Sequence, residues 1–60
     1  MNLQELKIYA IKVGIDYPSI KQEVNSLVEL CETEIEDGSS IENEIRLCKN
    51  DIEQLIEELK

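Results

Sequence analysis

The sequence contains no histidine, no tryptophan and no phenylalanine among its 60 residues. Without histidine, no cysteine, serine or threonine can recruit an imidazole as a general base. The two cysteines, Cys31 and Cys48, cannot supply the four ligands of a structural zinc site. Paired carboxylates can perform acid and base catalysis, but they need a cleft, which short helices are not expected to enclose. The sequence therefore predicts a protein that is not an enzyme and has no cofactor and no dedicated metal site.

Long apolar runs are also missing, since the longest is the four-residue run from Ile8 to Ile11. A membrane span needs about 20 apolar residues and a secretory signal about 7–15. We therefore expect a soluble cytoplasmic protein that stays where it is made and does not bind membranes. Cytosolic thiols normally stay reduced, so Cys31 and Cys48 are interpreted as small buried hydrophobic residues.

Basic residues are scarce, because six Lys or Arg stand against fourteen Asp or Glu and give a net charge of -8. An excess of carboxylates repels phosphate, which disfavours direct binding to nucleic acid and to anionic membranes. The expected charged partner is a protein with a basic surface.

A short helix is predicted over residues 3–13. Asn2 and Glu5 have the spacing of a capping box, in which each side chain accepts a hydrogen bond from the backbone of the other. Gly14 is expected to end this helix in the left-handed conformation. The apolar residues that recur at helical spacing are Leu3, Leu6, Ala10 and Val13.

Two longer helices are predicted over residues 18–36 and 40–59. Pro18 suits the first turn of the former, and Ser39-Ser40-Ile41-Glu42 predicts a second capping box before the latter. The apolar stripe of the former consists of Ile20, Val24, Leu27, Val28, Cys31 and Ile35. That of the latter consists of Ile41, Ile45, Cys48, Ile52, Leu55 and Leu59.

The short break at Gly38 favours an antiparallel hairpin of the two longer helices. Folding the chain back about Gly38 places Cys48 closest to Val28, about a turn from Cys31, so a disulfide is not expected. The short N-terminal helix is expected to lie across the hairpin. The prediction is a single all-α domain over residues 1–60, a three-helix bundle. A parallel two-stranded coiled coil is the other possible use of the last stripe.

Acidic residues gather around the predicted hairpin turn. Several of them lie at the C-terminal end of a helix, where the helix dipole disfavours negative charge by roughly 0.3–1 kcal/mol per residue. We interpret the group either as a solubilising tip or as a surface that binds a basic partner. Its seven members, with no Lys or Arg among them, are Glu29, Glu32, Glu34, Glu36, Asp37, Glu42 and Glu44.

A calcium loop is rejected for this region. With Gly38 as the obligatory sixth residue of an EF-hand loop, the first and third positions would be Thr33 and Ile35. The loop needs carboxylate or amide ligands at both positions, and these residues supply neither.

Four apolar residues fall outside the predicted core stripes, namely Ile8, Ile11, Leu30 and Leu47. Leu30 could pack against the N-terminal helix. Ile8 and Ile11 lie on one side of a helix whose other side already has its core residues, which predicts a second packing surface. This surface would serve partner docking or self-association, with a dimer as the favoured homo-oligomer.

The stretch from Glu34 to Ile45, continuing through Leu47-Cys48 to Asp51-Ile52-Glu53, resembles the small acidic helical accessory proteins of tailed bacteriophages. This resemblance implies a protein that binds and inhibits or regulates a host protein in the host cytoplasm, and it brings no defined site residues. The leading hypothesis is therefore a non-enzymatic protein-binding module with an acidic surface. The alternative is a self-assembling helical structural or oligomerisation element.

Overall fold

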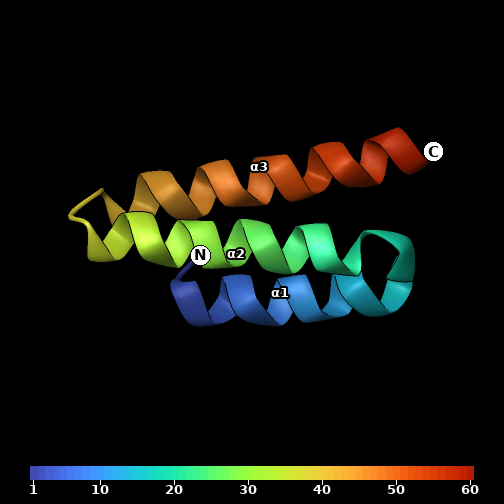
Figure 1. The fold of residues 1–60 in the computed structure, drawn as a ribbon, viewed down its shortest axis with the longest axis horizontal. Coiled ribbons are helices and arrows are strands. Elements are labelled where there is room, and N and C mark those ends of the chain that lie inside the picture. The colour runs from blue at the N-terminus through green and yellow to red at the C-terminus, as the bar shows by residue number, and fades with distance from the viewer.

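The computed structural model describes residues 1–60 and confirms the predicted all-α three-helix bundle. The elements are α1 (Leu3–Asp16), the 3-10 turn η1 (Pro18–Ile20), α2 (Lys21–Glu36) and α3 (Ile41–Leu59) (Figure 1). None of these helices has the length and apolar composition needed to cross a membrane.

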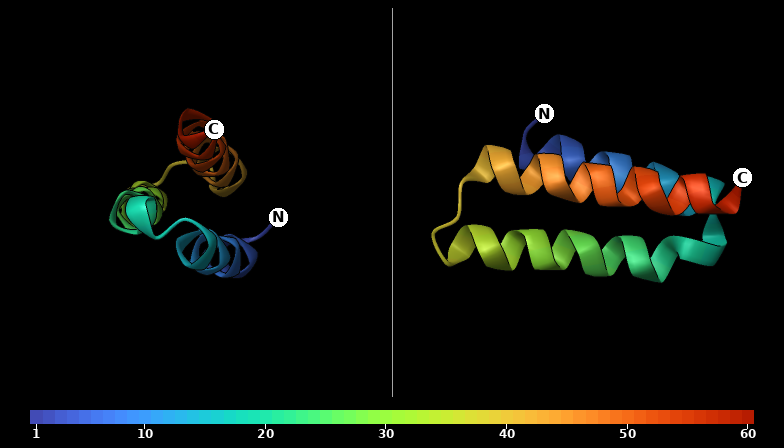
Figure 2. Two further views of the ribbon diagram at one scale, coloured as in Figure 1. Left: turned by 90° about the vertical axis from the view of Figure 1, so that its right-hand side faces the viewer. Right: turned by 90° about the horizontal axis from the view of Figure 1, so that it is seen from above.

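The three helices lie side by side, and α2 runs antiparallel to both α1 and α3 (Figures 1 and 2). Seen end-on, the helices form a triangle, and the molecule is 34 Å long. The prediction that the N-terminal helix lies across the hairpin is therefore wrong. With 14 residues against 16 in α2, α1 is long enough to pack alongside its neighbour for most of its length.

The core is formed by the apolar stripes that the sequence indicates. Its buried residues are Leu6, Ala10, Val13, Ile20, Val24, Val28, Cys31, Ile45, Cys48 and Ile52. The two ends of the predicted α3 stripe do not belong to the core, because Ile41 is 55% exposed and Leu59 is 47% exposed. With 19 residues, α3 is longer than α1 with 14, so α1 cannot cover its whole length.

The start of α1 is confirmed and its predicted end is wrong. Asn2 Oδ1 accepts a hydrogen bond from the Glu5 backbone N–H at 2.8 Å, and the Asn2 N–H donates to Glu5 Oε1 at 3.0 Å. Gly14 does not adopt a positive φ, and the helix continues to Asp16. A Cβ at Gly14 would lie 3.1 Å from Lys21 Cγ, so this buried glycine allows the start of α2 to pass closely.

The hairpin turn is a Schellman motif. Gly38 has φ 104°, its N–H donates to the Ile35 carbonyl at 3.1 Å, and the Ser39 N–H donates to the Glu34 carbonyl at 3.0 Å. The predicted second capping box is wrong. Ser40 is the N-cap and makes no side-chain hydrogen bond. With Ser40 as N-cap, the third helical residue is Asn43 rather than a glutamate.

The register of the α2–α3 hairpin also differs from the prediction. The thiols of Cys31 and Cys48 are close enough to influence each other's pKa, and both residues line the same surface depression. Cys48 was expected opposite Val28. The Schellman turn and the extended Ser40 shift the midpoint of the hairpin beyond Gly38, to the peptide between Ser39 and Ser40.

Candidate functional site

The predicted acidic residues are spread over three parts of the surface. Glu36, Asp37 and Glu42 are exposed at the hairpin turn. Glu34 and Glu44 are half-buried between α2 and α3. The remaining two face α1: Glu29 lines a depression beside that helix, and Glu32 Oε1 lies 3.5 Å from Lys7 Nζ.

Charge is strongly segregated along the chain. Residues 1–20 contain two Lys and two carboxylates, which cancel, so residues 21–60 carry the entire net charge of -8. The Lys7–Glu32 pair is the only ion pair in the structure, and its side chains are 45% and 37% exposed, respectively. The acidic side chains of the turn and of the α2–α3 surface therefore have no cationic partner within the chain.

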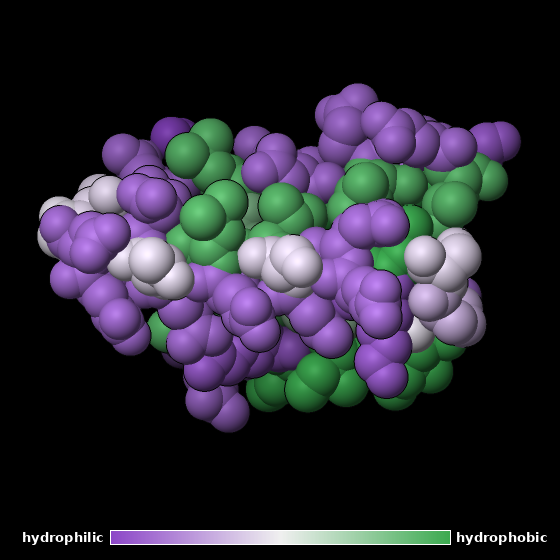
Figure 3. Space-filling view, viewed as in Figure 1, coloured by the Kyte–Doolittle hydropathy of each residue, from purple (hydrophilic) through white to green (hydrophobic).

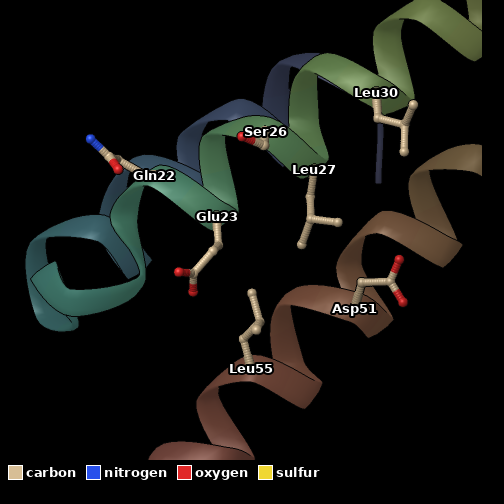
Figure 4. A pocket seen from close by; sticks show the side chains of 7 residues that line it. All are labelled: Gln22, Glu23, Ser26, Leu27, Leu30, Asp51 and Leu55. Atoms are coloured by element: carbon tan, nitrogen blue, oxygen red, sulfur yellow. The ribbon is translucent and has the colours of Figure 1, made fainter.

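A groove runs between α2 and α3 on the side away from α1. Its larger part has a volume of about 580 Å³ and is an open surface depression rather than an enclosed cleft. In Figure 4 the side chains of Leu27 and Leu55 point toward each other across the gap, with Glu23 beside them. This part is lined by Gln22, Glu23, Ser26, Leu27, Leu30, Asp51 and Leu55.

The groove continues toward the hairpin turn as a second depression of about 280 Å³, which shares Leu27, Leu30 and Asp51 with the first. The two depressions together are called the α2/α3 groove. Leucine side chains form its floor, and Leu30 and Leu47 are 57% and 51% exposed. Leu30 thus lies in the groove and not against α1. Figure 3 shows the corresponding apolar band between the two helices.

The rim of the α2/α3 groove is acidic. No Lys or Arg lines either depression, and the carboxylates that do are Glu23, Glu34, Glu44 and Asp51. Sequence reasoning did not assign Glu23 or Asp51 to a site. The spacing Glu23, Leu27, Leu30, Glu34 was a usable signal, because residues four, three and four apart share one helix face.

A second apolar surface lies on α1, opposite the helix face that enters the core. Ile8, Ile11 and Ile15 are 45%, 63% and 71% exposed, respectively, and their spacing places them on one stripe, called the α1 outer stripe. On a 3.6-residue period Lys7 and Lys12 flank this stripe on either side. Ile15 was not predicted as part of the surface, although its spacing of four from Ile11 continues the pattern.

The two thiols are poor nucleophiles near neutral pH. Burial raises the pKa of the Cys48 thiol to about 11, with smaller contributions from Cys31 and Asp51. Burial also raises the pKa of Cys31, and the nearby Glu44 carboxylate acts in the same direction. Nowhere in the structure do three or more His, Cys, Asp or Glu side chains converge as metal ligands.

Comparisons of this chain with protein-family models, with curated proteins and with solved structures found no match. Three surfaces are the candidates for function: the α2/α3 groove, the α1 outer stripe and the acidic turn, which consists of Glu36, Asp37 and Glu42.

Proposed function

We propose that this chain is a non-enzymatic protein-binding module whose acidic turn binds a basic surface on another protein. The segregation of charge supports this proposal most directly. Three exposed carboxylates at the turn, Glu36, Asp37 and Glu42, have no cation within the chain to neutralise them. Two of them lie at the C-terminal end of α2, where the helix dipole makes negative charge unfavourable in the unbound protein.

The biological role that we propose for this binding is inhibition or regulation of a host protein in the cytoplasm. That part of the proposal rests on the resemblance to small acidic accessory proteins of tailed bacteriophages. A basic substrate-binding or nucleic-acid-binding surface would be a suitable target, because carboxylates can imitate phosphates in charge.

The test is a matched pair of charge variants measured against a partner captured from a cell lysate and then purified. The turn variant combines Glu36→Gln, Asp37→Asn and Glu42→Gln. The control variant combines Glu53→Gln, Glu57→Gln and Glu58→Gln, which removes the same number of charges near the C-terminal end of α3, away from the turn (Figure 1).

The association rate constant is then measured at low and high salt. We expect the turn variant to associate more slowly and with a weaker salt dependence, because peripheral charges act mainly on the encounter rate. The control variant should associate nearly as fast as the parent. Equal slowing by both variants would show that net charge alone matters, and an unchanged rate in both would refute a role for the acidic turn.

A second candidate function is self-assembly, and the α1 outer stripe is the observation that favours it. Its three isoleucines are exposed on a helix segment without net charge, so a second copy, whose own net charge is -8, is repelled less at this surface than at the acidic turn. A single core of this size supplies only about 3–5 kcal/mol of net stability, and association would add to it.

A further inference from the structure

The α1 outer stripe and the α2/α3 groove are complementary in shape, polarity and charge. From this we infer that the chain self-associates head-to-tail, with the α1 outer stripe of one copy seated in the α2/α3 groove of the next. This inference rests on the second candidate function, self-assembly, and is independent of the proposed binding of a basic partner at the turn.

The lengths of the two surfaces agree. Ile8 and Ile15 are seven residues apart, or about 10 Å along a helix at 1.5 Å per residue. Leu47 and Leu55, at the two ends of the groove floor, are eight residues apart, or about 12 Å. The stripe therefore fits within the apolar part of the groove. Each surface supplies what the other lacks: isoleucines that project from a helix, and a depression lined with leucines.

The chain itself shows that a helix with this spacing packs on this helix pair. On the inner side of the bundle, α1 places Leu6, Ala10 and Val13 against α2 and α3, and all three residues are buried. Those residues are four and three apart, and the residues of the outer stripe are three and four apart. In the assembly, α1 would lie between two α2–α3 pairs, one from each copy.

The two surfaces allow three pairings, namely stripe with stripe, groove with groove, and stripe with groove. Charge favours the last of these. Two α1 outer stripes in contact would bring the lysines at positions 7 and 12 close to those of the other copy. Two grooves in contact would bring carboxylates against carboxylates, since Glu23, Glu34, Glu44 and Asp51 line them without any cation. With the stripe in the groove, the two lysines that flank the stripe lie beside the carboxylates of the rim. Lys7, at 45% side-chain exposure, remains accessible despite its pairing with Glu32.

The two surfaces lie on opposite sides of the bundle, so one copy can use both at once. In the end-on view of Figure 2, α1 occupies the corner of the triangle opposite the α2–α3 edge. Such a heterologous contact builds chains or rings rather than closed two-fold dimers. The mass of the assembly should therefore rise past that of a dimer as the protein concentration increases.

The test uses two complementary variants that leave the charge unchanged. The stripe variant combines Ile11→Gln with Ile15→Gln, and the groove variant combines Leu30→Gln with Leu47→Gln. The control combines Ile41→Gln with Leu59→Gln, two residues of similar exposure that belong to neither surface. All six side chains are exposed, and circular dichroism checks that each variant keeps the helical content of the parent.

Sedimentation across a range of protein concentrations measures association. We expect the parent and the control to associate alike, and each surface variant alone to associate at least about tenfold more weakly. An equimolar mixture of the two surface variants should form a 1:1 dimer and nothing larger, because each keeps one intact surface. High salt should not weaken association of the parent, since it also screens the repulsion between chains of net charge -8.

Several results would overturn the inference. A parent that stays monomeric at all concentrations would show that the head-to-tail contact does not form. That result would not bear on the proposed binding by the acidic turn, which the charge variants test separately. Dimers formed by either surface variant alone would show a two-fold contact through the surface that remains. If the mixture fails to form a dimer, or the control is weakened as much as the surface variants, the contact is not specific to stripe and groove.

Discussion

Cys31 on α2 and Cys48 on α3 lie close together at the helix interface, where only 3% and 4% of the two residues are exposed and each thiol influences the pKa of the other. Both are free cysteines, and each belongs to the buried core. They also line the smaller depression of the α2/α3 groove.

The first prediction is that a small disulfide oxidant converts this pair into an intramolecular disulfide. With oxidised glutathione, the two thiols lose two protons and two electrons and form one S–S bond, while the oxidant is reduced to two molecules of the thiol. Mass spectrometry should show a loss of two hydrogens without dimer formation. Thermal unfolding should shift upward, since a closed loop of this size adds about 3 kcal/mol in the chain-entropy model.

The rate of this oxidation should rise steeply with pH. The thiolate is the attacking species, and burial keeps both thiols protonated near neutral pH by raising the pKa of each. The Cys48→Ser variant is the control and should give only mixed or intermolecular disulfides. Failure of the native, folded parent to form the bond at alkaline pH would show that the two helices do not hold the thiols close enough.

The second prediction concerns stability at alkaline pH. The pKa of the Cys48 thiol is about 11 in the folded chain against an ordinary value of 9.0, so folding favours the protonated thiol. Below pH 9 both states are protonated and this contribution is fully present. Between pH 9 and 11 the unfolded chain ionises first, so the free energy of unfolding should fall.

Urea unfolding at several pH values measures this slope. Cys31 and Tyr9 also have a pKa raised mainly by burial, and both therefore contribute in the same direction. The Cys48→Ala variant should be less stable overall because it leaves a small cavity, but its stability should depend less on pH in this range. An identical slope in parent and variant would contradict the assignment to Cys48.

The periodic parts of this fold could be predicted from sequence, and the parts that depend on turn geometry could not. Which residues of a helix enter the core follows from spacing alone, and so Leu6, Val24 and Ile52, the largest fully buried side chains, were identified. The register between α2 and α3 depends instead on how many residues the turn consumes. A fold about Gly38 was assumed, whereas the Schellman turn and the extended Ser40 moved Cys48 from Val28 to Cys31.

The surface sites, too, could be predicted where they depend on helical spacing and not where they depend on the turn. The exposure of Ile8 and Ile11 followed from the helical period. The α2/α3 groove could not be predicted, because it combines residues of two helices whose relative register was predicted wrongly. Asp51 lies opposite Leu27 only in the observed register, and both line the groove. The acidic residues that form one group along the sequence point in different directions on α2 and α3, and Glu32 is paired with Lys7.

The third prediction compares the two helix N-caps. Asn2→Ala should lower the free energy of unfolding by about 1 kcal/mol, because the side chain of Asn2 accepts a hydrogen bond from the Glu5 N–H at 2.8 Å. Ser40→Ala should change it much less, because the Ser40 side chain makes no capping hydrogen bond. Urea denaturation of both variants measures the difference. Equal losses would mean that Ser40 caps α3 in solution after all.

The fourth prediction compares alanine substitutions at the two glycines, which differ in backbone conformation and in surroundings. Gly38 has φ 104°, a conformation that residues with a Cβ avoid, so Gly38→Ala should lower the free energy of unfolding by about 1 kcal/mol although the space around it is open. Gly14 lies within α1 at a helical φ, where alanine is intrinsically favoured by about 1 kcal/mol. Its added Cβ would lie 3.1 Å from Lys21 Cγ, so the flexible Lys21 side chain must shift by a few tenths of an ångström. We therefore expect Gly14→Ala to change the free energy of unfolding little. Lys21→Ala removes this contact. Adding Gly14→Ala to the Lys21→Ala variant should therefore raise its free energy of unfolding by the helix preference of alanine over glycine. A large loss for Gly14→Ala that persists in the Lys21→Ala background would show that backbone, rather than the Lys21 side chain, fills this space.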